Sequence, residues 1–382
     1  MVRKSIANWA RKIYPLRKLG LWIKQKCGWL GIPVIIPYRG YGNRECMYVS
    51  GSVSEDKGLA KPEKEHSLFI NMLAMLKRYT SDEIPGVRVK AVFMGKEMFA
   101  ITNQQGFFHF SFDIKGMVLP AENWQKIEFE LLDIITPEQK KTTAIGEVLI
   151  LKENDSEFGV ISDIDDTILV SHSTNTIRKL RLMLFKNAKT RLPFEGVAGF
   201  YKALQKGATG KCHNPIFYVS SSQWNLYDLL LDFCKIRKIP DGPFLLQNLE
   251  PVKFRSLINQ KKGIEKHIHK IEKIKNLLNT FNYLNFVLIG DSGQQDAEIY
   301  KKISIEFPGR VLAIYIRDIK KSKAKKINII GKQLDPLGVE MLLIKDTLLA
   351  AMHAIELGLI NKNQMEYVAS ERDRDHYAEI EI

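Results

Sequence analysis

The sequence predicts an α/β protein in which a doubly wound parallel sheet follows an all-β, sandwich-like region. From Phe158 onward, short continuously apolar segments alternate with segments of helical periodicity. That pattern is typical of buried parallel strands joined by helices. Before it, residues 32–154 contain short segments in which apolar and polar residues alternate between turn signals, as in a sandwich. A length of 382 residues, with 45% hydrophobic and 26% charged, suits one or two globular domains.

The first 31 residues form a basic arm. They carry eight Arg and Lys residues and no acidic residue, out of a net charge of +14 for the whole chain. Apolar residues recur at helical spacing, with Val2, Ile6, Trp9 and Ile13 leading the series. Two interpretations stay open: an amphipathic helix that anchors the protein at a membrane interface, or a helix that packs on the protein's own surface with a solvated charged face.

The segment 32–154 is predicted to be β-rich with one helical insertion at 62–78. Phe108, Phe110 and Phe112 alternate with polar residues directly after a Gln-Gln-Gly turn signal. The segments 87–93 and 127–131 alternate in the same way, and a further short run contains Val148 and Ile150. None of these residues has a catalytic spacing, so this domain carries no predicted chemistry.

The segment 155–360 is predicted to be the α/β domain. Strands are expected at 158–162, 215–219, 244–246, 286–290 and 311–316, and helices at 197–205, 225–237, 264–281 and 297–306. The apolar stretch 342–360 contains Lys345, Asp346, His353 and Glu356, and is interpreted as a helix of this domain rather than a membrane span. The segment 361–382 is charged and poor in apolar residues, and is interpreted as a tail.

Three predicted strands end in polar residues, and these ends define one site. Asp163, Asp165 and Asp166 follow the first strand, hydroxyl residues at 220–222 follow the second, and Asp291 follows a third, with Asp296 nearby. Because parallel strands end at one edge of a sheet, these side chains should converge. Clustered carboxylates repel one another and lose water, and a divalent cation removes that cost. The sequence therefore predicts a metal-assisted active site.

The first of these motifs, D-x-D-x-T at 163–167, resembles the first signature of the haloacid-dehalogenase (HAD) phosphohydrolases. That resemblance implies that Asp163 is a nucleophile that forms an aspartyl-phosphate. Asp165 can then protonate the leaving oxygen and activate water. Mg²⁺ prefers oxygen ligands, which Asp163, Asp165, Asp291 and Asp296 can supply. Ser220 can donate to the phosphoryl oxygens.

Five segments together resemble the catalytic domain of the actin-patch-protein phosphatidate phosphatase family, over roughly residues 145–350. They are FGVISDIDDT at 158–167, YVSSSQWNLY at 218–227, HKIEKI at 269–274, GDSGQQD at 290–296 and FPGRVLAIYIRD at 307–318. The resemblance implies a HAD fold and Mg²⁺-dependent hydrolysis of phosphatidate to diacylglycerol. By family position Lys270 binds phosphate, with Lys273 as the alternative. Thr167, Ser221 and Arg317 are the expected substrate contacts.

Charge and composition limit the partners. The basic arm and a second cluster of lysines at 320–326 imply anionic partners: a membrane surface or a phosphorylated substrate. Nucleic acid is disfavoured, because no module with interleaved aromatic and basic residues is visible. Four scattered cysteines indicate no disulfide framework, so we expect a cytoplasmic protein that can associate with membranes peripherally. Two alternatives remain: a HAD phosphatase of a soluble phosphate ester, and a basic scaffold protein that binds a membrane or nucleic acid without catalysis.

Overall fold

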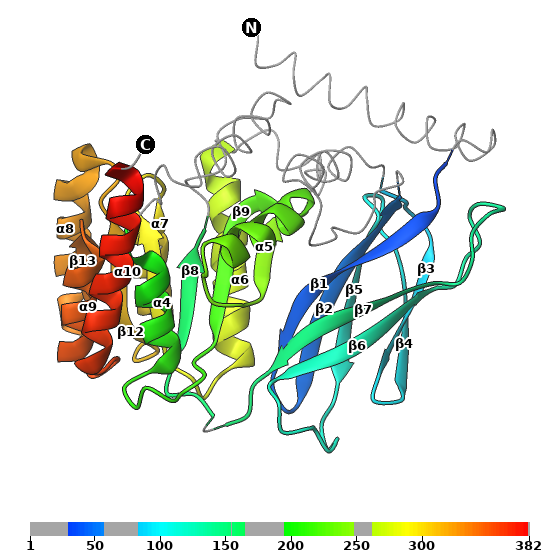
Figure 1. Cartoon of the computed structure of the whole chain (residues 1–382), viewed down its shortest axis with the longest axis horizontal. Coiled ribbons are helices and arrows are strands. Elements are labelled where there is room, and N and C mark those ends of the chain that lie inside the picture. Colours follow the sequence, from blue (N-terminus) through cyan, green and yellow to red (C-terminus); the bar gives the residue numbers. More distant parts are fainter. Residues whose placement is uncertain (1–29, 57–82, 154, 165–194, 248–261, 381–382) are drawn as a thin grey trace, which may run out of the picture. The chain divides into compact units, whose positions relative to one another are not determined.

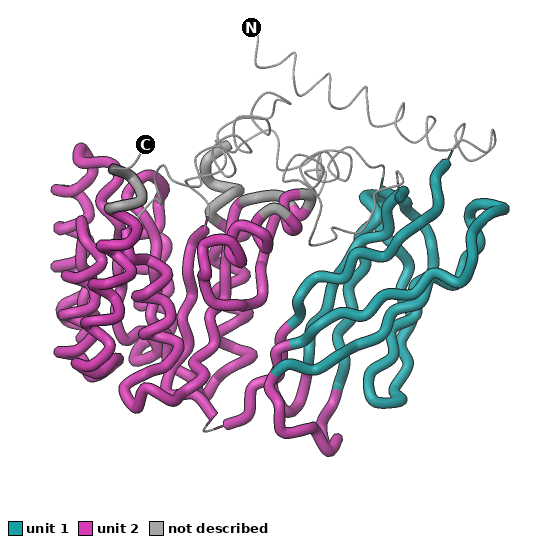
Figure 2. The backbone as a smooth tube through the Cα atoms, viewed as in Figure 1, with its two compact units in different colours: residues 1–40, 47–113, 124–148 teal, residues 41–46, 114–123, 149–382 magenta. Residues whose placement is uncertain are grey.

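The computed structural model describes residues 30–56, 83–153, 155–164, 195–247 and 262–380, and its chain divides into two compact units (Figure 2). One unit contains residues up to 40, 47–113 and 124–148, and the other contains 41–46, 114–123 and 149–382. Several sequence-based predictions lie outside the described residues: most of the arm, the helix at 62–78, and Asp165, Asp166 and Thr167.

The first sheet has seven strands in the order β4-β3-β6-β7-β1-β2-β5. The alternation of apolar and polar residues places one side of each strand in a core, as in β3, where Val89 and Ala91 are fully buried and Arg88 is exposed. Its strands are β1 (Pro33–Gly42), β2 (Cys46–Glu55), β3 (Arg88–Phe93), β4 (Lys96–Ile101), β5 (Phe107–Asp113), β6 (Trp124–Leu131) and β7 (Thr142–Ile150).

This sheet differs from the predicted sandwich. Its seven strands belong to a single sheet, and β4 and β5, at the two ends of the strand order, contact each other. The sheet is therefore curled and barrel-like rather than two facing layers. Alternation along a strand reports only which face is buried, and both arrangements bury one face of every strand. The phenylalanine-rich strand β5 supplies much of the core, with Phe108, Phe110 and Phe112 buried.

The second sheet has six strands in the order β10-β9-β8-β11-β12-β13, and all five neighbouring pairs are parallel (Figure 1). This confirms the predicted parallel sheet. The central strands are apolar throughout because helices cover both faces, and every residue of β11 is buried. The strands are β8 (Gly159–Asp163), β9 (Ile216–Gln223), β10 (Phe244–Gln247), β11 (Phe286–Asp291), β12 (Val311–Arg317) and β13 (Glu340–Ile344).

Right-handed connections distribute the helices over the two faces of this sheet. The helices α6, α7 and α8 contact one another in succession, while α4, α9 and α10 form a second group (Figure 1). The helices are α4 (Val197–Lys206), α5 (Tyr227–Ile236), α6 (Lys262–Thr280), α7 (Asp296–Glu306), α8 (Ala324–Lys332), α9 (Thr347–Glu356) and α10 (Asn363–Ile380). Short 3₁₀ turns lie at Trp224–Leu226, Lys321–Lys323 and Asp335–Leu337.

Two predictions near the end of the chain are wrong. The stretch read as one helix at 342–360 contains the end of β13 and then α9, because Asp346 caps a new helix by accepting from the amide of Leu348. The charged tail is helix α10, which packs on α4 and α9 through a narrow stripe that includes Val368. Because the stripe is narrow, the overall composition of this segment is polar.

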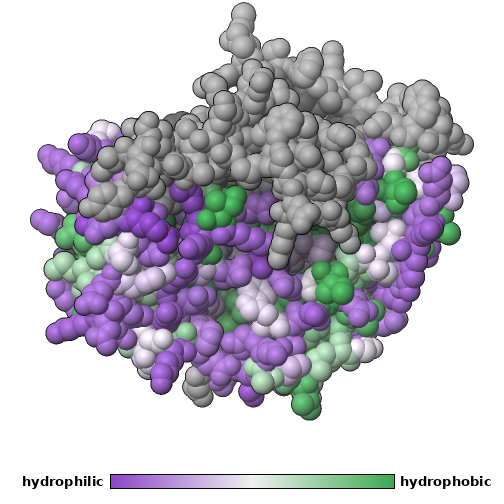
Figure 3. Space-filling view, viewed as in Figure 1, coloured by the Kyte–Doolittle hydropathy of each residue, from purple (hydrophilic) through white to green (hydrophobic). Residues whose placement is uncertain are grey.

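Hydrophilic side chains predominate on the face of the molecule shown in Figure 3.

Within the part of the chain that the structure describes, no helix is both long enough and apolar enough to cross a bilayer.

Candidate functional site

Two neighbouring strands deliver the first acidic side chains of the site. β8 ends at Asp163 and β11 ends at Asp291, and the two strands pair in parallel with Ser162 opposite Ile289. From β8 the chain winds outward to β9 and β10, and from β11 it winds the other way to β12 and β13. The two carboxylates therefore lie at the switch point of the sheet, beyond the carboxyl ends of the strands, where ligands of such folds bind.

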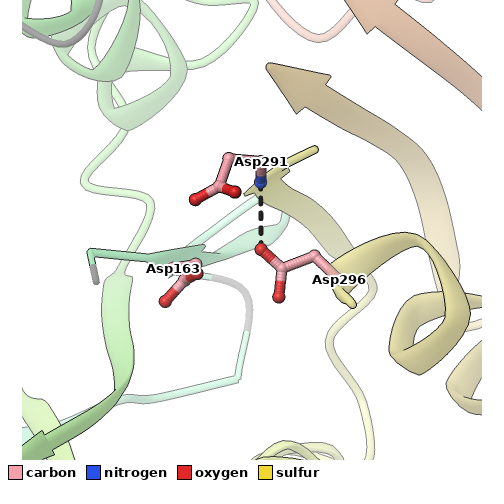
Figure 4. Close-up of side chains that lie close together, drawn as sticks. All are labelled: Asp163, Asp291 and Asp296. Atoms are coloured by element: carbon pink, nitrogen blue, oxygen red, sulfur yellow. Dashed lines mark hydrogen bonds between the residues drawn. The ribbon is translucent and has the colours of Figure 1, made fainter. Parts of the chain in front are cut away.

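A third carboxylate comes from Asp296, the first residue of α7. Asp163, Asp291 and Asp296 each offer an oxygen within 4.8 Å of those of the other two (Figure 4). Asp296 is fully buried, and its Oδ2 accepts the amide of Asp291 at 2.9 Å. Gly290 makes this approach possible, because a Cβ at that position would lie 2.4 Å from Oδ2 of Asp296.

One buried ammonium group joins two of the carboxylates. Lys270, on α6, places Nζ 2.5 Å from Oδ1 of Asp296 and 3.0 Å from Oδ2 of Asp163. The three side chains are 2% exposed or less. Buried charges require partners, so the Lys270 ammonium group stabilises both carboxylates, which would otherwise repel each other. Both oxygens of Asp296 thus have partners inside the protein.

The loop between β11 and α7 orients Asp291 and also reaches Asp163. Oδ1 of Asp291 accepts the amides of Gly293 and Gln294, at 2.6 and 3.1 Å, in a turn typical of aspartate. The side-chain amide of Gln294 donates to Oδ2 of Asp163 at 2.9 Å. Asp163 is therefore held from two sides, by Lys270 and by Gln294.

A tyrosine lies beneath the end of β8. The hydroxyl of Tyr201, on α4, is 2.6 Å from Oγ of Ser162, and Ser162 donates to the carbonyl of Asp163. Burial raises the pKa of Tyr201 to about 12, and the charge of Asp163 raises it too, while the bond to Ser162 and the charge of Arg317 lower it. The phenol stays protonated at neutral pH and acts as a neutral support of this strand end.

The structure brings together four of the predicted site residues: Asp163, Lys270, Asp291 and Asp296. Ser220, on β9, is buried, and its carbonyl accepts Nζ of Lys273 at 3.3 Å. Ser221 and Arg317 are half-buried, and Arg317 pairs in register with Asp291. Asp165 and Thr167 lie outside the described residues.

Gln294, Tyr201 and Gly290 were not predicted as site residues. Gln294 and Gly290 belong to the acidic motif at 290–296, where residues flanking a catalytic carboxylate could have been considered as its supports. No sequence signal marks Tyr201, which reaches the site from a different helix.

The arrangement is suited to a divalent cation. Three carboxylates lie close together and one ammonium group contacts two of them, so the formal charge of the four side chains is negative. Carboxylate oxygens are the ligands preferred by hard cations such as Mg²⁺, Ca²⁺ and Mn²⁺. These three carboxylates could therefore hold a metal ion. A ligand bound to that ion would be polarised by its positive charge, close to the carboxylate of Asp163.

The chain resembles known phosphatases over this region. Residues 158–318 match the family described as "Phosphatidate phosphatase APP1, catalytic domain". Phosphatidate phosphatase APP1 of Saccharomyces cerevisiae is 33% identical over 159 residues, which cover 42% of this chain and 25% of that protein. The resemblance predicted from the five sequence motifs is thereby confirmed for the segment that builds the site.

A second relative matches over a longer segment with lower identity. An uncharacterized protein of Schizosaccharomyces pombe is 27% identical over 280 residues, which cover 69% of this chain and 42% of that protein. The chain thus spans a quarter and about two fifths of the lengths of these two relatives. Among solved structures, a carbohydrate acetylesterase from Xanthomonas citri aligns over 75% of this chain and 68% of its own, with 9% identity and a TM-score of 0.26.

The contact between Gly290 and Asp296 predicts that Gly290→Ala destabilises the protein. The added methyl group must displace the Asp296 carboxylate, and overpacking of this kind costs about 1–3 kcal/mol. Gly331→Ala, in α8, is the comparison variant: a Cβ there would lie 3.3 Å from the carbonyl oxygen of Met341, a tight contact that needs a much smaller shift than the 2.4 Å approach at Gly290. Urea denaturation should show a loss for Gly290→Ala and a change within about 1 kcal/mol for Gly331→Ala. Equal stabilities for the two variants would contradict the close approach at Gly290.

Proposed function

We propose, from the match of residues 158–318 and from the carboxylate site within them, that the chain is a Mg²⁺-dependent phosphatidate phosphatase with a HAD-like catalytic domain. The observation that carries this proposal is the position of Asp163. It ends a central strand, contacts Lys270 and Gln294, and lies with Asp291 and Asp296 at the edge where α/β folds bind ligands.

In the proposed reaction Asp163 is the nucleophile. Its carboxylate oxygen attacks the phosphorus of phosphatidate, the bond to the glycerol oxygen breaks, and diacylglycerol leaves with a proton from Asp165. Water, deprotonated by Asp165, then attacks the aspartyl-phosphate, which releases inorganic phosphate and restores the Asp163 carboxylate. Lys270 offsets the negative charge that gathers on the transferring group, and Ser220 and neighbouring amides donate to its oxygens.

The proposed metal ligands are Asp163 and Asp291, together with the carbonyl of Asp165. Bound Mg²⁺ would supply positive charge at the phosphoryl oxygens. Asp296 was predicted as a ligand too, but its two oxygens accept from Lys270 and from the Asp291 amide. We therefore propose that Asp296 positions Lys270 and keeps Asp291 in place, rather than binding the ion directly.

We propose further that the basic arm, residues 1–31, binds anionic membranes. Its eight positive charges and no negative charge support this role, because phosphatidate resides in bilayers. The enzyme would then act as a peripheral membrane protein.

The nucleophile is tested with Asp163→Asn, which preserves the size of the side chain but removes the attacking anion and its ion pair with Lys270, so the fold of the variant is checked by circular dichroism. Phosphate release from phosphatidate in vesicles should fall by at least about 10³-fold. The reason is that the bond between the Asp163 oxygen and phosphorus forms only during the reaction, so its loss lowers turnover. Asp335→Asn, an exposed aspartate remote in sequence from the site motifs, is the control and should retain turnover. Near-native phosphate release by a folded Asp163→Asn protein would refute the assignment. Turnover of short soluble phosphate esters alone, with none of phosphatidate, would instead favour a soluble substrate.

The metal is tested by binding, without substrate. Calorimetric titration of Mg²⁺ into the native protein should show one site, and Asp291→Asn should weaken it by at least about 10-fold, because an amide replaces a charged ligand. The asparagine oxygen can still accept from Gly293 and Gln294, so the loop is preserved. Asp335→Asn again serves as the control. Unchanged Mg²⁺ affinity in Asp291→Asn would exclude Asp291 as a ligand.

The arm is tested in the full chain with four neutralising substitutions, Arg11→Gln, Lys12→Gln, Arg17→Gln and Lys18→Gln. Each basic residue near an anionic bilayer contributes about 1 kcal/mol, so binding to phosphatidylserine vesicles should fall by at least about 100-fold at low salt. Co-sedimentation at low and high salt measures this. Identical vesicle binding by the native and substituted chains would mean that the arm does not contact the membrane.

A further inference from the structure

A second basic surface lies on the described part of the chain, and we name residues 319–326 the basic edge patch. The patch contains five lysines and no acidic residue. Lys320, Lys321 and Lys325 are exposed, and Ile319 beside them is 44% exposed. An exposed isoleucine among lysines is the combination that interfacial segments use, with the apolar group entering the acyl boundary and the cations meeting the headgroups.

Three of these lysines have no protein partner among the described residues. No hydrogen bond or ion pair within that part of the chain involves the ammonium groups of Lys320, Lys321 and Lys325. Lys326 differs, since it forms an ion pair with Glu298 on α7. The three unpaired ammonium groups are therefore available to an anionic surface from outside the protein.

The patch is joined to the loop of the candidate site. Nζ of Lys323 donates to the carbonyls of Gly293 and Gln294, at 2.7 and 2.6 Å. The amide of Lys320 donates to Oγ of Ser292 at 2.7 Å. These residues belong to the same loop that orients Asp291 and whose Gln294 contacts Asp163. The patch and the site thus share one supporting loop.

The patch also leaves the sheet at the same edge as the site. It follows β12, whose last residue, Arg317, pairs in register with Asp291 at the end of β11. Because the strands are parallel, residues after β12 emerge on the side where Asp163 and Asp291 lie.

We propose that the basic edge patch docks on an anionic lipid surface and so presents the carboxyl edge of the sheet to phosphate headgroups. This inference rests on the proposed function, to which it adds the surface that orients the site at the bilayer. Lipid is favoured over nucleic acid because no aromatic residue occurs between 318 and 334 to stack on bases, whereas an exposed isoleucine is present.

The test uses the full chain with Lys320→Gln, Lys321→Gln and Lys325→Gln together. The matched control is Lys235→Gln, Lys332→Gln and Lys362→Gln, which removes the same charge from exposed lysines. Lys235 lies next to the last residue of α5, Lys332 is the last residue of α8, and Lys362 follows α9. These helices run from the carboxyl edge of the sheet to its amino edge, so the three control lysines lie toward the amino edge, away from the patch.

Vesicles of phosphatidylcholine and phosphatidylserine, without phosphatidate, are the probe. Three lysines at about 1 kcal/mol each correspond to about a 100-fold loss of vesicle binding for the patch variant, and the control should lose far less. Hydrogen–deuterium exchange supplies a local measurement, because the arm can also bind vesicles. Vesicles should slow exchange at residues 319–326 of the native chain on the order of 10-fold, and should not do so in the patch variant.

Exchange at 319–326 that is the same with and without vesicles would overturn the proposal, as would equal losses of binding in the patch and control variants. A patch variant that loses binding to a duplex oligonucleotide but not to vesicles would assign the patch to nucleic acid and also overturn it. The docking vesicles contain no phosphatidate, so docking is measured independently of catalysis. A chain that binds these vesicles through the patch, but releases no phosphate in the separate phosphatidate assay, would refute the proposed function and leave the docking proposal intact.

Discussion

The site depends on one buried ammonium group. Lys270 forms ion pairs with a carboxylate at the end of β8 and with another at the start of α7. Without this lysine the two buried carboxylates would repel each other, with little access to solvent. Removing one member of such a group costs about 3–5 kcal/mol, because the remaining charges stay buried without a partner. The position of α6 against the sheet is therefore tied to the chemistry, since this helix must deliver its lysine to the carboxyl edge.

The loop between β11 and α7 connects several functions through short contacts. It turns around the Asp291 carboxylate, holds Asp163 through Gln294, and receives Lys323 from the segment after β12. Gly290 allows the whole arrangement, since a side chain there would occupy the position of the Asp296 carboxylate. The seven residues 290–296 therefore include the Asp291 carboxylate and the two backbone amides that orient it. They also include the Gln294 side chain, which supports Asp163 at the end of the neighbouring strand.

Parallel strands explain why separate sequence motifs form one surface. Every strand of the second sheet points the same way, so the residues that follow β8, β9, β11 and β12 emerge at one edge. Carboxylates follow the central strands, and the lysine-rich segment follows β12. A negative site thus adjoins a positive surface on the same edge, and that polarity suits a substrate whose phosphate belongs to an anionic interface.

The sequence alone determined the parallel sheet, most of its strands and helices, and the acidic residues at the strand ends, because apolar runs and the polar residues that follow them are local features. It also indicated the all-β region, but not its single curled sheet, since alternation does not record which strands pair at a distance. Only the tertiary structure showed that Lys270 contacts the carboxylates of Asp163 and Asp296, and that Gln294 and Tyr201 support the end of β8. It also showed that the charged segment after residue 361 is a packed helix, α10. These outcomes depend on the rotation of a helix against the sheet and on contacts between residues far apart in sequence, and no local pattern encodes them.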